Sequence, residues 1–169
     1  TYLRDASAKP GHDDTVLDVD WCIECDSSAS PAVARAAQAL QAFLDVALGI
    51  RLPVTSDAGG GKAVRLALGL DADAETCWIE VRPDAVLLQG SDPGGLFQGV
   101  VYLQYLLRLR RAPYLAQGVT ERRPVFRTRI YRSILSPYSA DELLLDDAYY
   151  NDGILNHLAH EGFNGVWLH

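Results

Sequence analysis

The periodic pattern of apolar and polar residues begins at about position 15. Residues 1–14 are polar, are interrupted by proline and glycine and show no period, so we expect a disordered tail there. Apolar and polar residues then alternate over positions 17–24, and this two-residue period predicts a strand with one buried face. The apolar positions of this strand are Leu17, Val19, Trp21 and Ile23.

Two later segments show the three- and four-residue spacing of amphipathic helices. The first follows Ser30 and Pro31, which suit the N-cap and the first helical position, and Gly49 suits its C-terminal stop. Its apolar stripe consists of Val33, Ala37, Leu40, Leu44 and Leu48. The second helix follows Ser91-Asp92-Pro93 and extends to about position 111. Its buried face would use Leu96, Val100, Leu103 and Leu107, with Phe97 and Tyr105 beside it.

Short apolar segments between the two helices predict four more strands, at positions 50–54, 63–70, 78–81 and 86–89. The last two would form a hairpin around residues 82–85. Residues 15–111 therefore have the predicted order β-α-β-β-β-β-α. Short connections favour an antiparallel or mixed sheet with the two helices on one face. The sequence predicts an α+β domain over residues 15–111.

The pattern changes after Ala112-Pro113. We expect a connector over residues 112–124, a strand over 125–131, a helix over 146–161 and a short strand over 165–169. Strand, helix and strand in this order form the repeat of a parallel sheet or of a (β/α)₈ barrel. One such unit cannot cover both faces of its own strands. Residues 125–169 are therefore predicted to be the start of a truncated barrel, whose exposed apolar surface could join two copies as a homodimer.

Composition and charge exclude several classes of function. The formal net charge is −7 and the sequence pI is about 4.9, which argues against a nucleic-acid partner because phosphate binding needs clustered Lys and Arg. No apolar run reaches ~18 residues, so we expect no membrane partner. The three cysteines form no even disulfide framework. We expect no cofactor, and the sequence does not indicate a compartment.

Two acidic or histidine-containing motifs resemble catalytic or metal-binding signatures. The pair Asp141-Glu142 follows Ser139, and a serine N-cap with acidic residues in the first helical turn explains it without chemistry. Residues 157–161 lack the order of the inverted zinc motif and a third ligand, which disfavours a metallohydrolase. His157 and Glu161 are four residues apart on the predicted helix, where an ordinary ion pair is expected.

Two further motifs involve cysteine and glycine. Cys22 and Cys25 close a predicted strand, and alternation would place the two thiols on opposite faces, unlike a redox pair at a helix N-terminus. Residues 59–62 (GGGK) lack the other residues of a phosphate-binding loop. The three tryptophans lie within predicted strands, where core packing is the expected role.

The segment 78–108 resembles the second domain of family 20 glycoside hydrolases, the β-N-acetylhexosaminidases, and is similar to the N-terminal domain of family 67 α-glucuronidases. In both families a hairpin precedes a motif that opens a helix. The matching motif here is Ser91-Asp92-Pro93-Gly94-Gly95-Leu96-Phe97-Gln98-Gly99. Residues 123–127 look like the lead into barrel strand 1, and residues 157–169 are similar to barrel helix 1 followed by strand 2. The resemblance extends over residues 15–169.

This resemblance implies a parent exo-glycosidase that acts on hexosaminides or glucuronides, with carbohydrate as its partner. In the hexosaminidases the catalytic Asp-Glu pair lies on barrel strand 4, which this chain does not reach. Glycoside hydrolysis needs two carboxyls, or one with a participating acetamido group, at the C-terminal ends of barrel strands. We therefore expect this chain to be inactive alone and to support the barrel. The alternative is a stand-alone carbohydrate-binding or interaction domain.

The resemblance also indicates candidate substrate-binding residues. The hexosaminidases use an arginine from barrel strand 1 to hold sugar hydroxyls, and either Arg129 or Arg132 could correspond to it. His169 ends the next predicted strand. A salt bridge in the barrel core or at its bottom face is the alternative explanation for the arginines.

Overall fold

The computed structural model describes residues 4–25, 30–132 and 150–167. The chain divides into two compact units, unit 1 (Thr1–Arg123) and unit 2 (Pro124–His169). Each unit is described by itself.

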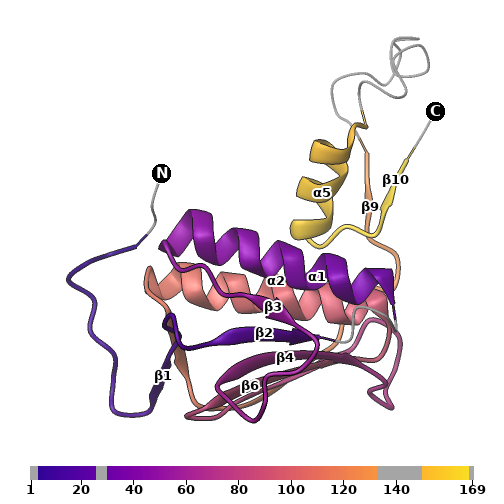
Figure 1. Cartoon of the computed structure of the whole chain (residues 1–169). Helices are drawn as coiled ribbons and strands as arrows, with labels where there is room; N and C mark the ends of the chain where they lie inside the picture. The colour runs from indigo at the N-terminus through magenta and orange to yellow at the C-terminus, as the bar shows by residue number, and fades with distance from the viewer. Residues whose placement is uncertain (1–3, 26–29, 133–149, 168–169) are drawn as a thin grey trace. The chain divides into compact units, whose positions relative to one another are not determined.

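Unit 1 is an α+β sandwich in which two helices cover one face of a six-stranded mixed sheet (Figure 1). The strand order is β3-β2-β4-β6-β5-β8; the first four strands are parallel, and β5 pairs antiparallel with β6 and β8. The strands are β2 (Cys22–Cys25), β3 (Val54–Thr55), β4 (Ala63–Leu68), β5 (Cys77–Val81), β6 (Ala85–Gly90) and β8 (Gly118–Arg122). This arrangement confirms the predicted fold class, with the mixed form of the sheet.

The helices begin where the sequence places their caps. Ser30 precedes α1 (Pro31–Phe43), and its side chain accepts a hydrogen bond of 3.2 Å from the backbone N–H of Ala32. A π-helical turn, η1 (Leu44–Leu48), continues α1 and ends at Gly49, whose φ of 69° is the left-handed conformation that glycine adopts at no steric cost. Asp92 caps α2 (Pro93–Arg110). The local chemistry of the caps therefore fixes both helix starts.

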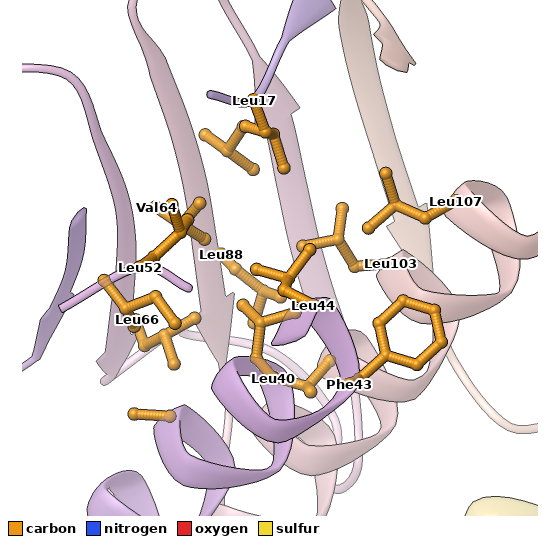
Figure 2. Packing of buried hydrophobic residues seen from close by; sticks show 14 of the residues in the cluster. Leu17, Leu40, Phe43, Leu44, Leu52, Val64, Leu66, Leu88, Leu103 and Leu107 are labelled. Carbon is orange, nitrogen blue, oxygen red and sulfur yellow. The ribbon is translucent and has the colours of Figure 1, made fainter. Parts of the chain in front are cut away.

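Apolar side chains from both helices and from the inner face of the sheet, many of them leucines, form the core (Figure 2). Leu40 and Leu44 meet Leu88 of the sheet, and Leu103 projects from α2 into the same cluster. Each of these four side chains is at most 1% exposed. Burying one such side chain contributes about 1.5–3 kcal/mol, so this layer between helices and sheet is the main source of stability in unit 1.

The strand predicted over residues 17–24 is only partly correct, because only its end lies in a strand, β2. β1 (Asp14–Val16) ends before the alternating segment, and Trp21 N–H donates to the Asp18 carbonyl at 3.2 Å within a turn. Trp21 is buried, but Val19 is 79% exposed. A turn does not keep the two-residue period of a strand, so alternation in the sequence does not place Val19 on the buried face.

The tail predicted over residues 1–14 is ordered in its described part, residues 4–14. The Asp5 N–H donates to the Arg111 carbonyl at 2.7 Å, and the Gln117 N–H donates to the Asp13 carbonyl at 2.9 Å. The Arg110 guanidinium holds the Asp14 carboxylate with two hydrogen bonds of 3.0 and 3.2 Å. These contacts join segments about a hundred residues apart, which no local pattern reveals.

The connector predicted over residues 112–124 contains two strands. β7 (Tyr114–Ala116) pairs antiparallel with β1, and β8 forms an edge of the main sheet beside β5. The sequence of β8 (GVTER) does not alternate between apolar and polar residues, because this strand has no buried face. Its pairing with β5 holds it in the sheet. Unit 1 therefore includes the whole of β8 and ends at Arg123.

Unit 2 contains β9 (Ile130–Tyr131), α5 (Asp152–His160) and β10 (Gly165–Val166). β9 and β10 are parallel, with Ile130 opposite Gly165 and Tyr131 opposite Val166, so the described elements form a β-α-β unit. Both strands are shorter than predicted: strand pairing covers two residues of 125–131 and two of 165–169. No helix in the described parts of the chain is long and apolar enough to cross a membrane.

Candidate functional site

Hydrogen bonds of Arg129 and Asn164 connect neighbouring segments at the N-terminal end of the β9–β10 strand pair in unit 2. The Asn164 side chain accepts from the Arg129 N–H at 2.9 Å and donates to the Arg127 carbonyl at 2.7 Å. The Arg129 guanidinium donates to the carbonyls of Gly162 and Phe126 at 2.6 and 2.7 Å. These contacts tie the turn after α5 to the start of β9. Arg129 therefore has a structural role at the strand start.

Arg132 lies at the opposite end of the pair, immediately after β9, and its side chain is exposed. In a (β/α)₈ barrel the ends that follow the strands form the active face, whereas the strand starts form the bottom. The position of Arg132 fits a sugar contact better than that of Arg129 does. His169 would follow β10, but it lies outside the described residues.

The described carboxylates of unit 2 are Asp152 and Glu161, at opposite ends of α5. Nine residues of helix separate their Cα atoms by about 13 Å along the axis. The carboxyl pair of a glycosidase is about 5–9.5 Å apart. These two groups therefore do not form a catalytic pair. Asp141 and Glu142 lie outside the described residues.

The histidines of α5 are His157 and His160. The His160 ring nitrogen Nδ1 lies 2.7 Å from the Asn156 carbonyl, one helical turn earlier. Among the described residues, no group of three His, Cys, Asp or Glu side chains could hold a metal ion. The ion pair expected between His157 and Glu161 is not present in the described part of α5; the Glu161 backbone N–H instead donates to the His157 carbonyl at 3.0 Å.

The cysteines are free thiols in packed surroundings. Cys25 is buried on the core side of β2 and Cys22 is half-buried on the other face, as the alternation predicts. Burial raises the pKa of the Cys22 thiol, and the Glu24 carboxylate adds to this effect. Burial also raises the pKa of the Cys77 thiol. A raised pKa reduces the reactive thiolate, so neither thiol has the properties of a redox nucleophile.

The three tryptophans occupy different environments. Trp21 is in the core, as expected. Trp78 lies on β5 between the core residues Cys77 and Ile79, so its side chain is on the other face of the sheet, where it is half-buried. Trp167 follows β10 and is 52% exposed. The expectation of core packing is therefore wrong for Trp78 and Trp167, because strand membership does not tell which face a side chain occupies.

The motif at residues 91–99 joins α2 to the hairpin. The Asp92 carboxylate accepts hydrogen bonds from the backbone N–H groups of Gly95 and Glu75, at 2.8 and 2.9 Å. The Ser91 hydroxyl accepts from the Thr76 N–H at 3.1 Å. A Cβ on Gly95 would lie 2.3 Å from the Thr76 carbonyl oxygen, so only glycine permits this close approach. The role of the motif is therefore structural and not catalytic.

Residues 6–120 match the family model described as glycosyl hydrolase family 20, domain 2. The chain belongs to this family. The family 20 domain 2 match covers the sandwich of unit 1, including the N-terminal segment and most of β8. No curated protein matches the chain at a significant level.

Solved structures extend the similarity beyond the family 20 domain. A mutant β-hexosaminidase from Streptomyces plicatus, in complex with its product GlcNAc, is 28% identical with a TM-score of 0.70, over 97% of this chain and 33% of that one. A family 20 β-N-acetylhexosaminidase from Streptomyces coelicolor A3(2) is 26% identical with a TM-score of 0.67, over 95% of this chain and 32% of that one. The chain spans about a third of the length of these hexosaminidases.

A family 115 4-O-methyl-α-glucuronidase shares the fold at 14% identity, with a TM-score of 0.63 over 90% of this chain and 25% of that one. Together these findings confirm the predicted resemblance to the N-terminal region of hexosaminidase-like and glucuronidase-like glycoside hydrolases. Asn164 is a structural residue that the sequence did not predict. Its only local signal is its place two residues after Gly162, in a turn between a helix and a strand.

Proposed function

We propose that this chain is the front region of an exo-glycosidase of the hexosaminidase or glucuronidase type. In this proposal unit 1 supports the catalytic barrel, and unit 2 supplies the first strands of that barrel. The observation that carries the proposal is the similarity to a whole hexosaminidase region, which covers 97% of this chain and therefore includes both units.

The proposal assigns catalysis to residues other than those described here. Glycoside hydrolysis needs converging carboxyls at the C-terminal ends of barrel strands. Arg132 follows β9 and Trp167 follows β10. Neither residue is a carboxylic acid, and the carboxylates of α5 are too far apart to act together. We therefore expect this chain to have no glycosidase activity of its own.

Arg132 is the substrate-binding residue that the proposal favours within this chain. It follows a barrel-type strand, and a guanidinium can donate several hydrogen bonds to sugar hydroxyls. Carbohydrate is the proposed partner, and nucleic acid and membrane are not. His169 remains a second candidate at the end of the next strand.

The exposed apolar residues of unit 2 support homodimer formation by this chain. Val125 is 90% exposed, Phe126 72% and Trp167 52%. Such side chains next to a two-stranded sheet favour association with a second copy or with further barrel strands. Light scattering after size-exclusion chromatography tests the association. A monomer at all concentrations would contradict the homodimer.

The activity is tested with the 169-residue chain and with the longest polypeptide that its gene encodes. Both are assayed with 4-nitrophenyl N-acetyl-β-D-glucosaminide and with a 4-nitrophenyl α-D-glucuronide. We expect no turnover by the 169-residue chain and turnover of one substrate class by the longer product. Turnover by the 169-residue chain, or none by the longer product on either class, would refute the proposal.

A second candidate function is a carbohydrate-binding module. The specific observation in its favour is the position of Trp78 on the sheet face opposite the helices. This function is compatible with a place in a larger glycosidase.

A further inference from the structure

The helices of unit 1 cover only one face of its sheet (Figure 1). The other face includes Trp78 of β5, whose neighbours on this face are both apolar and polar. Leu87 of β6 and Val119 of β8 are its neighbours one register step away, because Glu80 pairs with both of them and lies two residues from Trp78 on the same face. Val119 is 60% exposed, and Trp78 and Leu87 are half-buried.

Polar side chains lie directly beside the tryptophan. Trp78 pairs with Gln89 of β6 on one side and with Glu121 of β8 on the other. Opposite residues in antiparallel strands have Cβ atoms about 4.5–5.5 Å apart, so an amide and a carboxylate flank the indole ring. The face thus presents an aromatic surface between two hydrogen-bonding groups.

We propose that this sheet face binds a neutral, β-linked oligosaccharide, at a site formed by residues of unit 1 alone. A β-linked pyranose has an apolar face of C–H groups and a rim of hydroxyls. The indole of Trp78 suits the C–H face, and the amide and carboxylate suit the hydroxyls at the rim. Binding sites of this kind combine apolar area with a few placed polar groups.

The charges on this face favour a neutral ligand. The Arg65 guanidinium lies 2.9 Å from the Glu24 carboxylate, and the Arg82 guanidinium lies 2.7 Å from the Glu80 carboxylate. Within each pair the two charges offset one another, and Glu121 adds a further negative charge to the face. These side chains therefore give the face no net positive charge that would attract a polyanionic glycan. The affinity for a neutral glycan does not depend on this net charge.

The proposal rests on the second candidate function, carbohydrate binding through Trp78, and is independent of the proposed glycosidase function. The binding residues all belong to unit 1, whereas the first barrel strands belong to unit 2. Loss of binding without loss of activity in the longer gene product, or the reverse, separates the two ideas.

The test is isothermal titration of the 169-residue chain with cellohexaose and with chitohexaose, two neutral β-1,4-linked oligosaccharides, and with oligogalacturonate as the acidic comparison. We expect binding of at least one neutral ligand and none of oligogalacturonate. In Trp78→Ala the affinity should fall about tenfold or more, as is usual when a central aromatic contact is truncated. In Trp78→Phe, which keeps an aromatic ring, the affinity should stay within about threefold to fivefold of the original.

Trp167→Ala is the matched control, because it removes an exposed tryptophan from unit 2. It should leave the affinity unchanged. Circular dichroism checks that each variant is folded, which is expected because Trp78 lies outside the core. If Trp78→Ala is unfolded, the more conservative Gln89→Ala and Glu121→Gln variants carry the test and should each weaken binding.

Three results would overturn the proposal. The first is no binding of either neutral oligosaccharide at millimolar concentration. The second is equal loss of affinity in the Trp78 and Trp167 variants. The third is a dimer that Trp78→Ala converts to a monomer, which would make this face a contact between two copies of the chain.

Discussion

Gly95 of α2 should be far less tolerant of alanine than Gly94, although the two glycines are adjacent in the same helical turn. A Cβ on Gly95 would lie 2.3 Å from the Thr76 carbonyl oxygen and 3.0 Å from the carbonyl carbons of Glu75 and Thr76. All of these are backbone atoms. A Cβ on Gly94 would meet side-chain atoms instead, Cγ of Glu75 at 3.1 Å and the carboxylate of Asp92 at 3.2 Å.

The free-energy difference follows from these contacts. An ordinary contact between carbon and oxygen needs roughly one ångström more than Gly95 offers, and overpacking of this kind costs about 1–3 kcal/mol or somewhat more. The Thr76 carbonyl also accepts the Ser91 N–H at 2.9 Å, so moving it strains a second hydrogen bond. Replacing glycine by alanine in a helix stabilises the folded state by about 0.5–1 kcal/mol at either position. We therefore expect Gly95→Ala to cost about 2 kcal/mol, and Gly94→Ala to be neutral or slightly stabilising.

Urea unfolding, followed by tryptophan fluorescence, measures both variants. With a slope of about 2 kcal/mol/M, the midpoint of Gly95→Ala should shift down by roughly 1 M relative to the original chain. Gly99→Ala should fall between the two, because its Cβ would meet side-chain carbons of Leu88 and Cys77 at 2.9 and 3.1 Å. Equal midpoints for Gly94→Ala and Gly95→Ala would refute the reasoning, and so would a stabilised Gly95→Ala. If Gly95→Ala does not fold, the order of the other two still tests it.

Three further predictions concern the cap of α2, a buried thiol and the two arginines of unit 2. Asp92→Ala removes the acceptor of two backbone N–H groups and should cost about 1–2 kcal/mol by urea unfolding, with Asp92→Asn in between. Burial raises the pKa of the Cys77 thiol above its ordinary value of 9.0. The contribution of the neutral thiol to stability is therefore complete below about pH 9 and is lost as the pH rises through the raised pKa. Cys77→Ala should lose less unfolding free energy at high pH than the original chain does, and an equal loss would contradict this. Arg129→Ala should speed amide hydrogen exchange over residues 126–131, because the variant loses two hydrogen bonds to backbone carbonyls, and unchanged exchange would contradict this. Arg132→Ala should lower the activity of the longer enzyme, and full activity would contradict the proposed sugar contact.

Much of the candidate site could not be settled from the sequence. Arg129 and Arg132 are three residues apart, and a resemblance to barrel strand 1 allows either to hold a sugar. The structure separates them because strand pairing begins at Ile130, which leaves Arg129 at the start of the strand and Arg132 at its end. Register is a property of two segments together, so a single strand sequence does not contain it.

The sequence by itself determined the features that depend on neighbouring residues. Ser30 and Asp92 start the helices and Gly49 ends the first one, because caps are made by side chains and backbone groups a few residues apart. The periods of three and four residues also identified the buried faces of both helices, and the motif at 91–99 identified the family.

The tertiary structure alone decided the pairings between distant segments. It made β2, β4 and β6 parallel, placed the polar strand β8 at a sheet edge, and tied Asp14 to Arg110 across 96 positions. It also put Trp78 on the face that the helices leave uncovered. These outcomes depend on which strands meet and in what register. Strand pairing and register are determined by the packing of the whole domain, so a short stretch of sequence does not predict them.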